Sequence, residues 1–329
     1  MGHSDRQTPS TVPVKPTLYR HPHGITAVDA HYLYPGHAAA HIVVDGGRAA
    51  FVDVGTNDSV PHLLAALQEL GVPRDAVDYV LLTHVHLDHA GGAGTLMREL
   101  PRAQAVLHPR GAPHMIDPAK LIAGSKVVYG EERFARLYGT LVPIPPARVR
   151  VVTDGERLRL GARELTLLHT RGHAEHHYVV VDEAHASIFT GDTFGLSYRA
   201  LDTPTGVFIV PATVPTQFDP AQAIASIDRL LAYKPEVMYL MHFSRVTQVP
   251  RLGEMLKAQI REFVRIGRAH ADDADPRPGI RTAMLAHWVS LLRLQGSTLG
   301  AADIEGALRG DLELNTEGLI VWLQREKRA

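Results

Sequence analysis

Residues 83–92, Thr-His-Val-His-Leu-Asp-His-Ala-Gly-Gly, place three histidines and one aspartate within six positions. Apolar residues 79–82 come directly before this stretch, a pattern typical of a buried strand. The glycine pair lets the chain turn at once into a helix over residues 94–100. Imidazole and carboxylate groups together bind borderline divalent ions such as zinc, manganese or iron. The stretch therefore predicts a metal site where a strand ends.

The spacing inside this stretch favours one shared pocket. In a strand, His84 and His86 lie on the same face. The turn after them brings Asp88 and His89 back toward the same point. The competing interpretation is that these histidines are ordinary hydrogen-bonded polar residues, which is the commoner role of a lone histidine. Four ligand-type residues in six positions favour the metal site.

Three further apolar runs lead to residues of the same kind, namely His173, Asp192 and His242. Packing alone gives no reason for four predicted strands each to end in a metal-binding residue type. The chain contains no cysteine, so disulfides and thiolate ligands are excluded. Any metal in this protein is therefore held by nitrogen and oxygen atoms.

Taken in order, these motifs resemble the metallo-β-lactamase superfamily. The pattern is His-x-His-x-Asp-His, a lone histidine after Thr-x-Gly, then Gly-Asp-Thr and a late histidine, over roughly residues 19–245. Phe-Val-Asp-Val-Gly at 51–55 is similar to the upstream Asp-x-Gly element of that family. The resemblance implies an α/β fold, an αββα sandwich with two metals in a cleft along one edge of the sheets. Arg171 stands where many relatives have proline, and we expect it to alter the loop and not the ligands.

The same resemblance implies a set of metal ligands. It assigns His84, His86 and His173 to the first metal, Asp88, His89 and His242 to the second, and Asp192 to the bridge between them. Two divalent metal ions are expected, zinc in the first place, with iron or manganese as alternatives. Asp88 and Asp192 are the expected catalytic carboxylates, with either Asp88 or a water on the second metal moving a proton to the leaving group.

Two divalent ions about 4 Å apart share a hydroxide and polarise a substrate oxygen, which fits hydrolysis of an ester, thioester or lactone. Glyoxalase II thioesterases and acyl-homoserine lactonases have the ligand set found in this sequence. Persulfide dioxygenases resemble glyoxalase II and use a single iron, so a mononuclear iron oxygenase stays open as the alternative. A non-catalytic binding protein is disfavoured because all seven ligand residues are present.

The charge balance bears on partners. With 34 basic and 35 acidic residues the net charge is −1, which gives no electrostatic attraction to nucleic acid or an anionic membrane. No stretch reaches the ~20 apolar residues of a membrane span. Residues 1–16 are polar and proline-rich and lack the pattern of a secretory signal. We expect a cytoplasmic enzyme with a small-molecule substrate and without a nucleic-acid or membrane partner.

Three segments are expected along the chain. They are a flexible N-terminal tail (1–16), a metallo-β-lactamase-like catalytic domain (17–247) and a small helical C-terminal module (248–329). Packing, dimerisation as a homodimer, or cover of the cleft are the candidate roles of the module. Its later helices are predicted over residues 282–294, 301–308 and 317–325.

Several residues near the motifs have two interpretations. Asp53 either orients the ligands or is a helix N-cap or turn residue. Of the neighbours His176 and His177, at most one can face the cleft, and His177 is favoured as the contact of a ligand. His108 and His114 have no partner spacing and are interpreted as structural or surface residues.

Two segments are less regular. The proline-rich residues 195–219 predict either a wall of the substrate cleft, with Tyr198 and Phe208 as contacts, or a surface loop that packs its own apolar residues. Residues 111–147, which include Tyr129, predict a short helix, a lid or a dimer contact.

Overall fold

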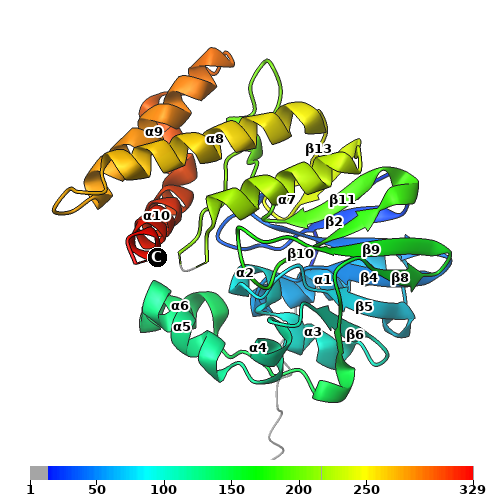
Figure 1. The fold of residues 1–329 in the computed structure, drawn as a ribbon. Helices are drawn as coiled ribbons and strands as arrows, with labels where there is room; N and C mark the ends of the chain where they lie inside the picture. Colours follow the sequence, from blue (N-terminus) through cyan, green and yellow to red (C-terminus); the bar gives the residue numbers. More distant parts are fainter. Residues whose placement is uncertain (1–13, 216, 329) are drawn as a thin grey trace, which may run out of the picture.

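In the computed structural model, which describes residues 14–215 and 217–328, two β-sheets pack face to face and helices cover both outer faces (Figure 1). This arrangement confirms the predicted αββα sandwich. Residues 14–17 have no regular structure, and the rest of the predicted N-terminal tail lies outside the described residues. No helix of the described residues is long and apolar enough to cross a membrane.

The first sheet has seven strands in chain order. They are β1 (Leu18–His21), β2 (Ile25–Asp29), β3 (Ala39–Asp45), β4 (Arg48–Val52), β5 (Val77–Leu81), β6 (Gln104–Leu107) and β7 (Val149–Val151). Strands β1 to β4 pair antiparallel and β4 to β7 pair parallel. Gly46 and Gly47 connect β3 to β4 with positive φ angles of 54° and 75°, as a tight hairpin turn requires.

The second sheet has six strands. In spatial order they are β13 (Ser244–Val246), β12 (Val237–Leu240), β11 (Ser187–Gly191), β10 (Tyr178–Asp182), β9 (Arg163–His169) and β8 (Glu156–Leu160). Only β11 and β12 pair parallel. A buried apolar core lies between the two sheets and includes Val43 and Val52 from the first sheet and Val180 and Phe189 from the second. Ile42, next to Val43, faces the opposite side because successive side chains of a strand alternate.

Two groups of helices cover the sandwich (Figure 1). The first group comprises α1 (Val60–Glu69), α2 (Leu87–Ala90), α3 (Ala93–Glu99), α4 (Ala112–Ile116), α5 (Ala119–Tyr129) and α6 (Glu131–Tyr138). The second comprises α7 (Pro220–Ala232), α8 (Val249–Ala269), α9 (Arg277–Leu294) and α10 (Ala301–Glu326). Short 3-10 turns are η1 (Asn57–Ser59), η2 (Arg74–Ala76), η3 (Pro146–Arg148), η4 (Glu183–His185) and η5 (Arg199–Leu201).

The C-terminal helices share one apolar core with the outer face of the second sheet. Val181 and Ile188 of the sheet belong to the same buried cluster as Trp288 of α9 and Leu319 of α10. These helices therefore extend the layer that α7 begins. The boundary predicted at residue 248 stays a prediction.

The prediction of two separate helices over 301–308 and 317–325 is wrong, because α10 runs without a break through Asn315 and Thr316. Thr316 Oγ1 donates to the carbonyl of Leu312 one turn earlier (2.7 Å), as threonine does inside a helix. Asn315 is buried and makes its hydrogen bonds with residues 211–213. Since a distant segment satisfies Asn315, it does not cap a new helix here.

Candidate metal centre

The seven predicted ligand residues converge at one edge of the sandwich, where β5, β11 and β12 end. The predicted strand ends earlier than expected, at Leu81, so His84 and His86 lie in an extended loop between β5 and α2. Asp88 and His89 lie on the single turn of α2. The remaining three follow β9, β11 and β12, as predicted.

One cluster contains three imidazoles and a carboxylate. His84 Nε2 lies 2.8 Å from His86 Nδ1, and His173 Nε2 lies 3.3 Å from His84 Nε2 and 3.1 Å from His86 Nδ1. Asp192 Oδ2 lies 3.5 Å from His173 Nε2. All four ligand atoms fall within 4.8 Å of one another, so one ion can contact them together.

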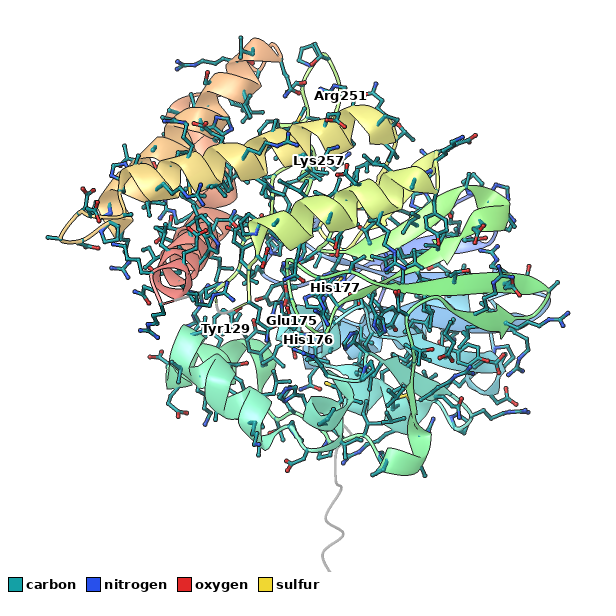
Figure 2. The ribbon with its side chains drawn as sticks, viewed as in Figure 1. Tyr129, Glu175, His176, His177, Arg251 and Lys257 are labelled. Carbon is teal, nitrogen blue, oxygen red and sulfur yellow. The ribbon has the colours of Figure 1, made fainter. Side chains whose placement is uncertain are left out.

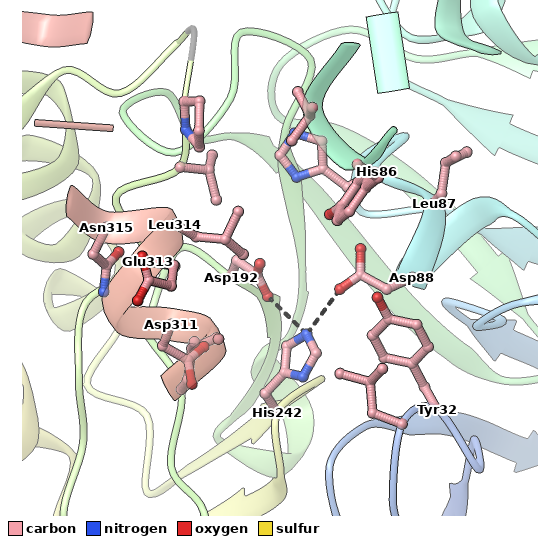
Figure 3. A pocket seen from close by; sticks show the side chains of 18 of the residues that line it. Tyr32, His86, Leu87, Asp88, Asp192, His242, Asp311, Glu313, Leu314 and Asn315 are labelled. Atoms are coloured by element: carbon pink, nitrogen blue, oxygen red, sulfur yellow. Dashed lines mark ion pairs between the residues drawn. The ribbon is translucent and has the colours of Figure 1, made fainter. Parts of the chain in front are cut away.

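The second cluster lies on the other side of Asp192. Asp88 Oδ2 lies 3.3 Å from His242 Nε2 and 3.9 Å from His89 Nε2. Asp192 Oδ1 lies 3.2 Å from His89 Nε2 and 3.9 Å from His242 Nε2. Figure 3 shows His242 between Asp88 and Asp192. Asp192 therefore presents one carboxylate oxygen to each cluster.

Hydrogen bonds to the outer ring nitrogens fix the tautomers. His173 Nδ1 donates to the carbonyl of Ala212 (3.0 Å), and His242 Nδ1 donates to the carbonyl of His37 (2.9 Å). A carbonyl only accepts, so both Nδ1 atoms carry the proton and both Nε2 lone pairs point into the clusters. Metal-binding histidines typically have such partners.

Asp53 fixes two further imidazoles. Its Oδ2 accepts from His89 Nδ1 (2.9 Å) and its Oδ1 from the backbone N–H of Thr83 (2.9 Å). The Thr83 hydroxyl donates its single hydrogen to Asp53. In its contact with His84 Nδ1 (3.2 Å) it can therefore only accept, so His84 Nδ1 carries the proton. Asp53 has a φ of +57°, in the left-handed region that aspartate tolerates. The alternative that Asp53 is a helix N-cap is wrong, because Thr56 is the residue that precedes η1.

These residues fit divalent cations. Among the described residues, no lysine or arginine lies at ion-pair distance from Asp88 or Asp192. Asp192 Oδ1 and His89 Nε2 are buried without a hydrogen-bond partner. Inward-facing lone pairs beside buried carboxylates need a positive charge, which a cation supplies. Nitrogen and oxygen ligands without sulfur suit zinc, iron or manganese.

Electrostatics favour the metal-binding forms of the first cluster. At the second cluster burial alone would lower the pKa values of His89 and His242, but the surrounding carboxylates raise them, so a cation there would displace protons from these two imidazoles. Burial, with the neighbouring imidazoles of His89 and His86, holds the pKa of His84 well below its usual value. Burial alone would raise the pKa of Asp192, but His89 and His173 bring it well below its usual range. A neutral imidazole and an ionised carboxylate are the forms that bind a metal ion.

Only one of the neighbours His176 and His177 faces the cavity, and His177 contacts a predicted ligand, as the sequence predicts. His177 is fully buried, and its Nε2 accepts from the backbone N–H of Asp192 (3.3 Å), so it positions that ligand. His176 faces the cavity beside the metal centre. Figure 2 shows both histidines with Glu175 in the middle of the molecule, and Tyr129 beyond them.

A cavity of about 760 Å³ opens beside the clusters and includes His86, Asp88, Asp192 and His242 in its wall (Figure 3). Its other walls come from the loop after β2, from α5, from the loop after β11 and from α10. Lining residues from these four segments include Tyr32, Leu33, Tyr34, His37, Leu121, Val128, Tyr129, Leu196, Tyr198, Val214, Asp311 and Leu314.

The residues that line this cavity bear on the predictions for the proline-rich loop and for two isolated histidines. Tyr198 lines it, as expected, whereas Phe208 does not and is buried in the apolar core of the C-terminal helices. His114 also lines the cavity, and its interpretation as a structural or surface residue stays a prediction. His108 packs against His169 instead, with 4.1 Å between ring centroids.

Sequence reasoning missed Asp311 and Tyr32. The Tyr198 hydroxyl donates to Asp311 Oδ1 (3.2 Å), and burial raises the pKa of Asp311 to about 6. The Tyr32 hydroxyl pairs with that of Tyr138 (2.8 Å) and lies beside Asp88 in Figure 3. Neither residue belongs to a local motif, so nothing in the linear sequence marks them. Tyr129 lies at the end of α5 and lines the cavity, which places part of the irregular segment 111–147 at the site.

Comparison with known proteins agrees with this geometry. The model of the metallo-β-lactamase superfamily matches residues 33–242. A metallo-β-lactamase fold-containing protein of Sulfurisphaera tokodaii is 26% identical over 226 residues, which cover 67% of this chain and 77% of that protein.

Two relatives are named by an activity. A hydroxyacylglutathione hydrolase of Xanthomonas euvesicatoria is 29% identical over 204 residues, and an acyl-coenzyme A thioesterase of Gallus gallus is 28% identical over 186 residues. These matches cover 62% and 51% of this chain. The chain spans only 59% and 62% of the length of these two relatives.

Solved structures show the same fold. An archaeal superfamily protein from Sulfolobus tokodaii superposes with a TM-score of 0.64 at 23% identity, covering 91% of this chain and 99% of that protein. A family protein from Thermus thermophilus gives 0.65 at 22% identity, covering 92% and 94%. With the family model covering most of the chain and its motifs meeting at one site, this protein belongs to the metallo-β-lactamase superfamily.

Proposed function

We propose that this protein is a metal-dependent hydrolase that binds two divalent cations and cleaves an ester, thioester or lactone. The position of Asp192 carries the proposal, because its two oxygens face two separate clusters of ligand atoms. In this arrangement His84, His86 and His173 would hold one cation and Asp88, His89 and His242 the other, and Asp192 would serve both, since its Oδ2 lies by the first group and its Oδ1 by the second.

Bound divalent cations supply a nucleophilic hydroxide at neutral pH and polarise the substrate carbonyl. The protein contributes Asp88, whose side chain is 18% exposed and lines the cavity. Burial raises the pKa of Asp88, but His89 and His242 lower it further, so this carboxylate is ionised at neutral pH. This is the form that binds a metal ion. Because Asp88 lies in the cavity wall beside the proposed second cation, either Asp88 or a water on that cation would pass the proton to the leaving group.

The names of the relatives support acyl transfer to water. Hydroxyacylglutathione hydrolase and acyl-coenzyme A thioesterase both describe cleavage of an acyl thioester. A thioester is therefore the first substrate class to test. A small-molecule substrate, the absence of nucleic-acid and membrane partners, a homodimer and a cytoplasmic location remain predictions from the sequence.

Elemental analysis and a substrate panel test the proposal together. Protein purified without added metal should contain close to two divalent ions per chain and should hydrolyse a thioester or lactone faster than a phosphodiester. One iron per chain with consumption of oxygen would support the mononuclear oxygenase instead. Asp192→Asn should lose turnover, whereas Asp45→Asn, in the β3–β4 turn, should retain it.

A further inference from the structure

The cavity carries apolar side chains that have no packing role in the fold. Leu33, Val128, Val214 and Leu314 line it, and none of them belongs to an apolar core cluster. Leu33 is 50% exposed and Val128 is 47% exposed. A folded chain gains little by leaving large apolar side chains in water, so their convergence on one cavity indicates a ligand that covers them.

These side chains come from four distant segments. Leu33 lies in the loop after β2, Val128 on α5, Val214 in the loop after β11 and Leu314 on α10. None of the eleven residues of α5 is buried, although apolar residues make up most of the helix. Leu121, Ile122 and Tyr129 pack partly against neighbouring apolar clusters, whereas Val127 and Val128 are 87% and 47% exposed. The C-terminal end of α5 therefore presents an apolar surface that the described residues leave uncovered.

This apolar wall begins next to the metal centre. Figure 3 shows Leu314 on α10 between the helix and Asp192, and Leu87 beyond Asp88. A cavity of about 760 Å³ holds more than a small acyl group. An extended chain bound at the reacting carbon can therefore continue along the wall.

The charges around the cavity do not select an anionic or a cationic group. Lys120, Arg133 and Arg309 line it together with Asp311 and the α10 carboxylates. Charges of both signs at a rim give no net attraction for a polyanion. The uncovered apolar surface is therefore the feature of this cavity that would favour one substrate over another, through the apolar area that the substrate buries.

We propose that the substrates carry an apolar acyl chain of several carbons, and that Val128 and Leu314 set the length of chain that the cavity accepts. This inference rests on the hydrolase function proposed above. It assigns the C-terminal helix α10 a direct role in substrate specificity.

A homologous series of thioesters of one small thiol, from acetyl to dodecanoyl, tests the inference with the metal-loaded protein. kcat/KM should rise by up to about fourfold per methylene until the chain exceeds the cavity, since burying a methylene contributes ~0.8 kcal/mol. Leu314→Ala should reduce kcat/KM for the long chains about tenfold. Val128→Trp should move the optimum to shorter chains. Leu294→Ala, at an 80% exposed position at the end of α9, is the matched control and should change nothing.

Binding of the free carboxylates, measured by calorimetry, separates this inference from the proposed function. Dodecanoate should bind more tightly than acetate, and Leu314→Ala should weaken dodecanoate alone. Hydrolysis with equal kcat/KM for all chain lengths, or equal binding of the two acids, would refute the proposed acyl-chain specificity but would leave the proposed hydrolase function unaffected. Tight binding of dodecanoate without hydrolysis of any thioester would refute the proposed hydrolase function but would support binding of an apolar chain in the cavity. Val128→Trp changes an exposed position, so it keeps the test valid if Leu314→Ala fails to fold.

Discussion

Asp53→Asn is the change that best tests whether hydrogen bonding outside the ligand set controls this metal centre. Asp53 is buried and accepts from His89 Nδ1 and from the backbone N–H of Thr83. Asparagine has the same shape and tolerates the φ of +57°, so the backbone is not strained. If the amide oxygen of the new side chain keeps accepting from the Thr83 N–H, the amide NH2 group faces the N–H of His89 Nδ1. Two hydrogen-bond donors then face each other without an acceptor. His89 must move its proton to Nε2 or turn away, and either change removes a lone pair from the second cluster.

The magnitude follows from the bonds that are lost. One charge-assisted hydrogen bond contributes about 1.5–3 kcal/mol to the free energy of unfolding, and the Thr83 bond is retained. Loss of the residue that orients a histidine ligand lowers metal affinity about 10–100-fold. Since a tenfold change equals about 1.4 kcal/mol, the expected loss of binding free energy is about 1.4–2.8 kcal/mol at the second cluster.

Equilibrium dialysis against graded chelator, read by elemental analysis, measures both metals. The more weakly held ion should be lost from Asp53→Asn at a 10–100-fold higher free metal concentration than from the wild type, and the other ion should change little. Asp45→Asn is the control, because Asp45 accepts from the N–H groups of Ala162 (2.7 Å) and Arg163 (3.2 Å) away from the centre. Equal metal affinity in wild type and Asp53→Asn, at equal folded fraction, would refute the reasoning.

Four further outcomes are expected. Asp192→Ala should abolish turnover and lower the metal content of both clusters, because its two carboxylate oxygens face the two clusters. Retention of two ions per chain would exclude the proposed bridging role of Asp192. Asn315→Leu should lower the free energy of unfolding by about 2–4 kcal/mol, since its amide holds the 211–213 backbone, and should weaken metal binding because the Ala212 carbonyl orients His173; unchanged thermal unfolding would contradict this. Burial raises the pKa of Asp311 from 3.8 to about 6, so the folded state holds a proton that the unfolded state releases and stability falls as pH rises between these values. The melting temperature of Asp311→Asn should therefore exceed that of the wild type increasingly from pH 3.8 to about 6, and parallel curves would exclude the effect. Chelator treatment should lower the melting temperature and added zinc should restore it, as for any ligand bound only by the folded state.

The sequence alone predicted the sandwich and the candidate ligands, because both follow from a family resemblance that rests on local motifs. Each ligand follows a short apolar run, and such runs predict strands from a pattern of a few residues. Gly46 and Gly47 likewise mark the β3–β4 hairpin through the backbone angles that its turn requires. The candidate ligands follow β5 of one sheet and β9, β11 and β12 of the other, so their meeting at one point also depends on how the two sheets pack.

The tertiary structure decided what surrounds the metal centre. Phe208 and Tyr198 come from one proline-rich loop, yet packing against the C-terminal helices buries the first and leaves the second at the cavity. Asn315 has the residue type of a helix start, but its hydrogen bonds to a segment about a hundred residues away keep α10 continuous. Asp311 and Leu314 reach the cavity because α10 packs against α8 and α9 and is tied through Asn315 to residues 211–213. Side-chain contacts between distant segments depend on how whole layers pack, and no local pattern of residues records them.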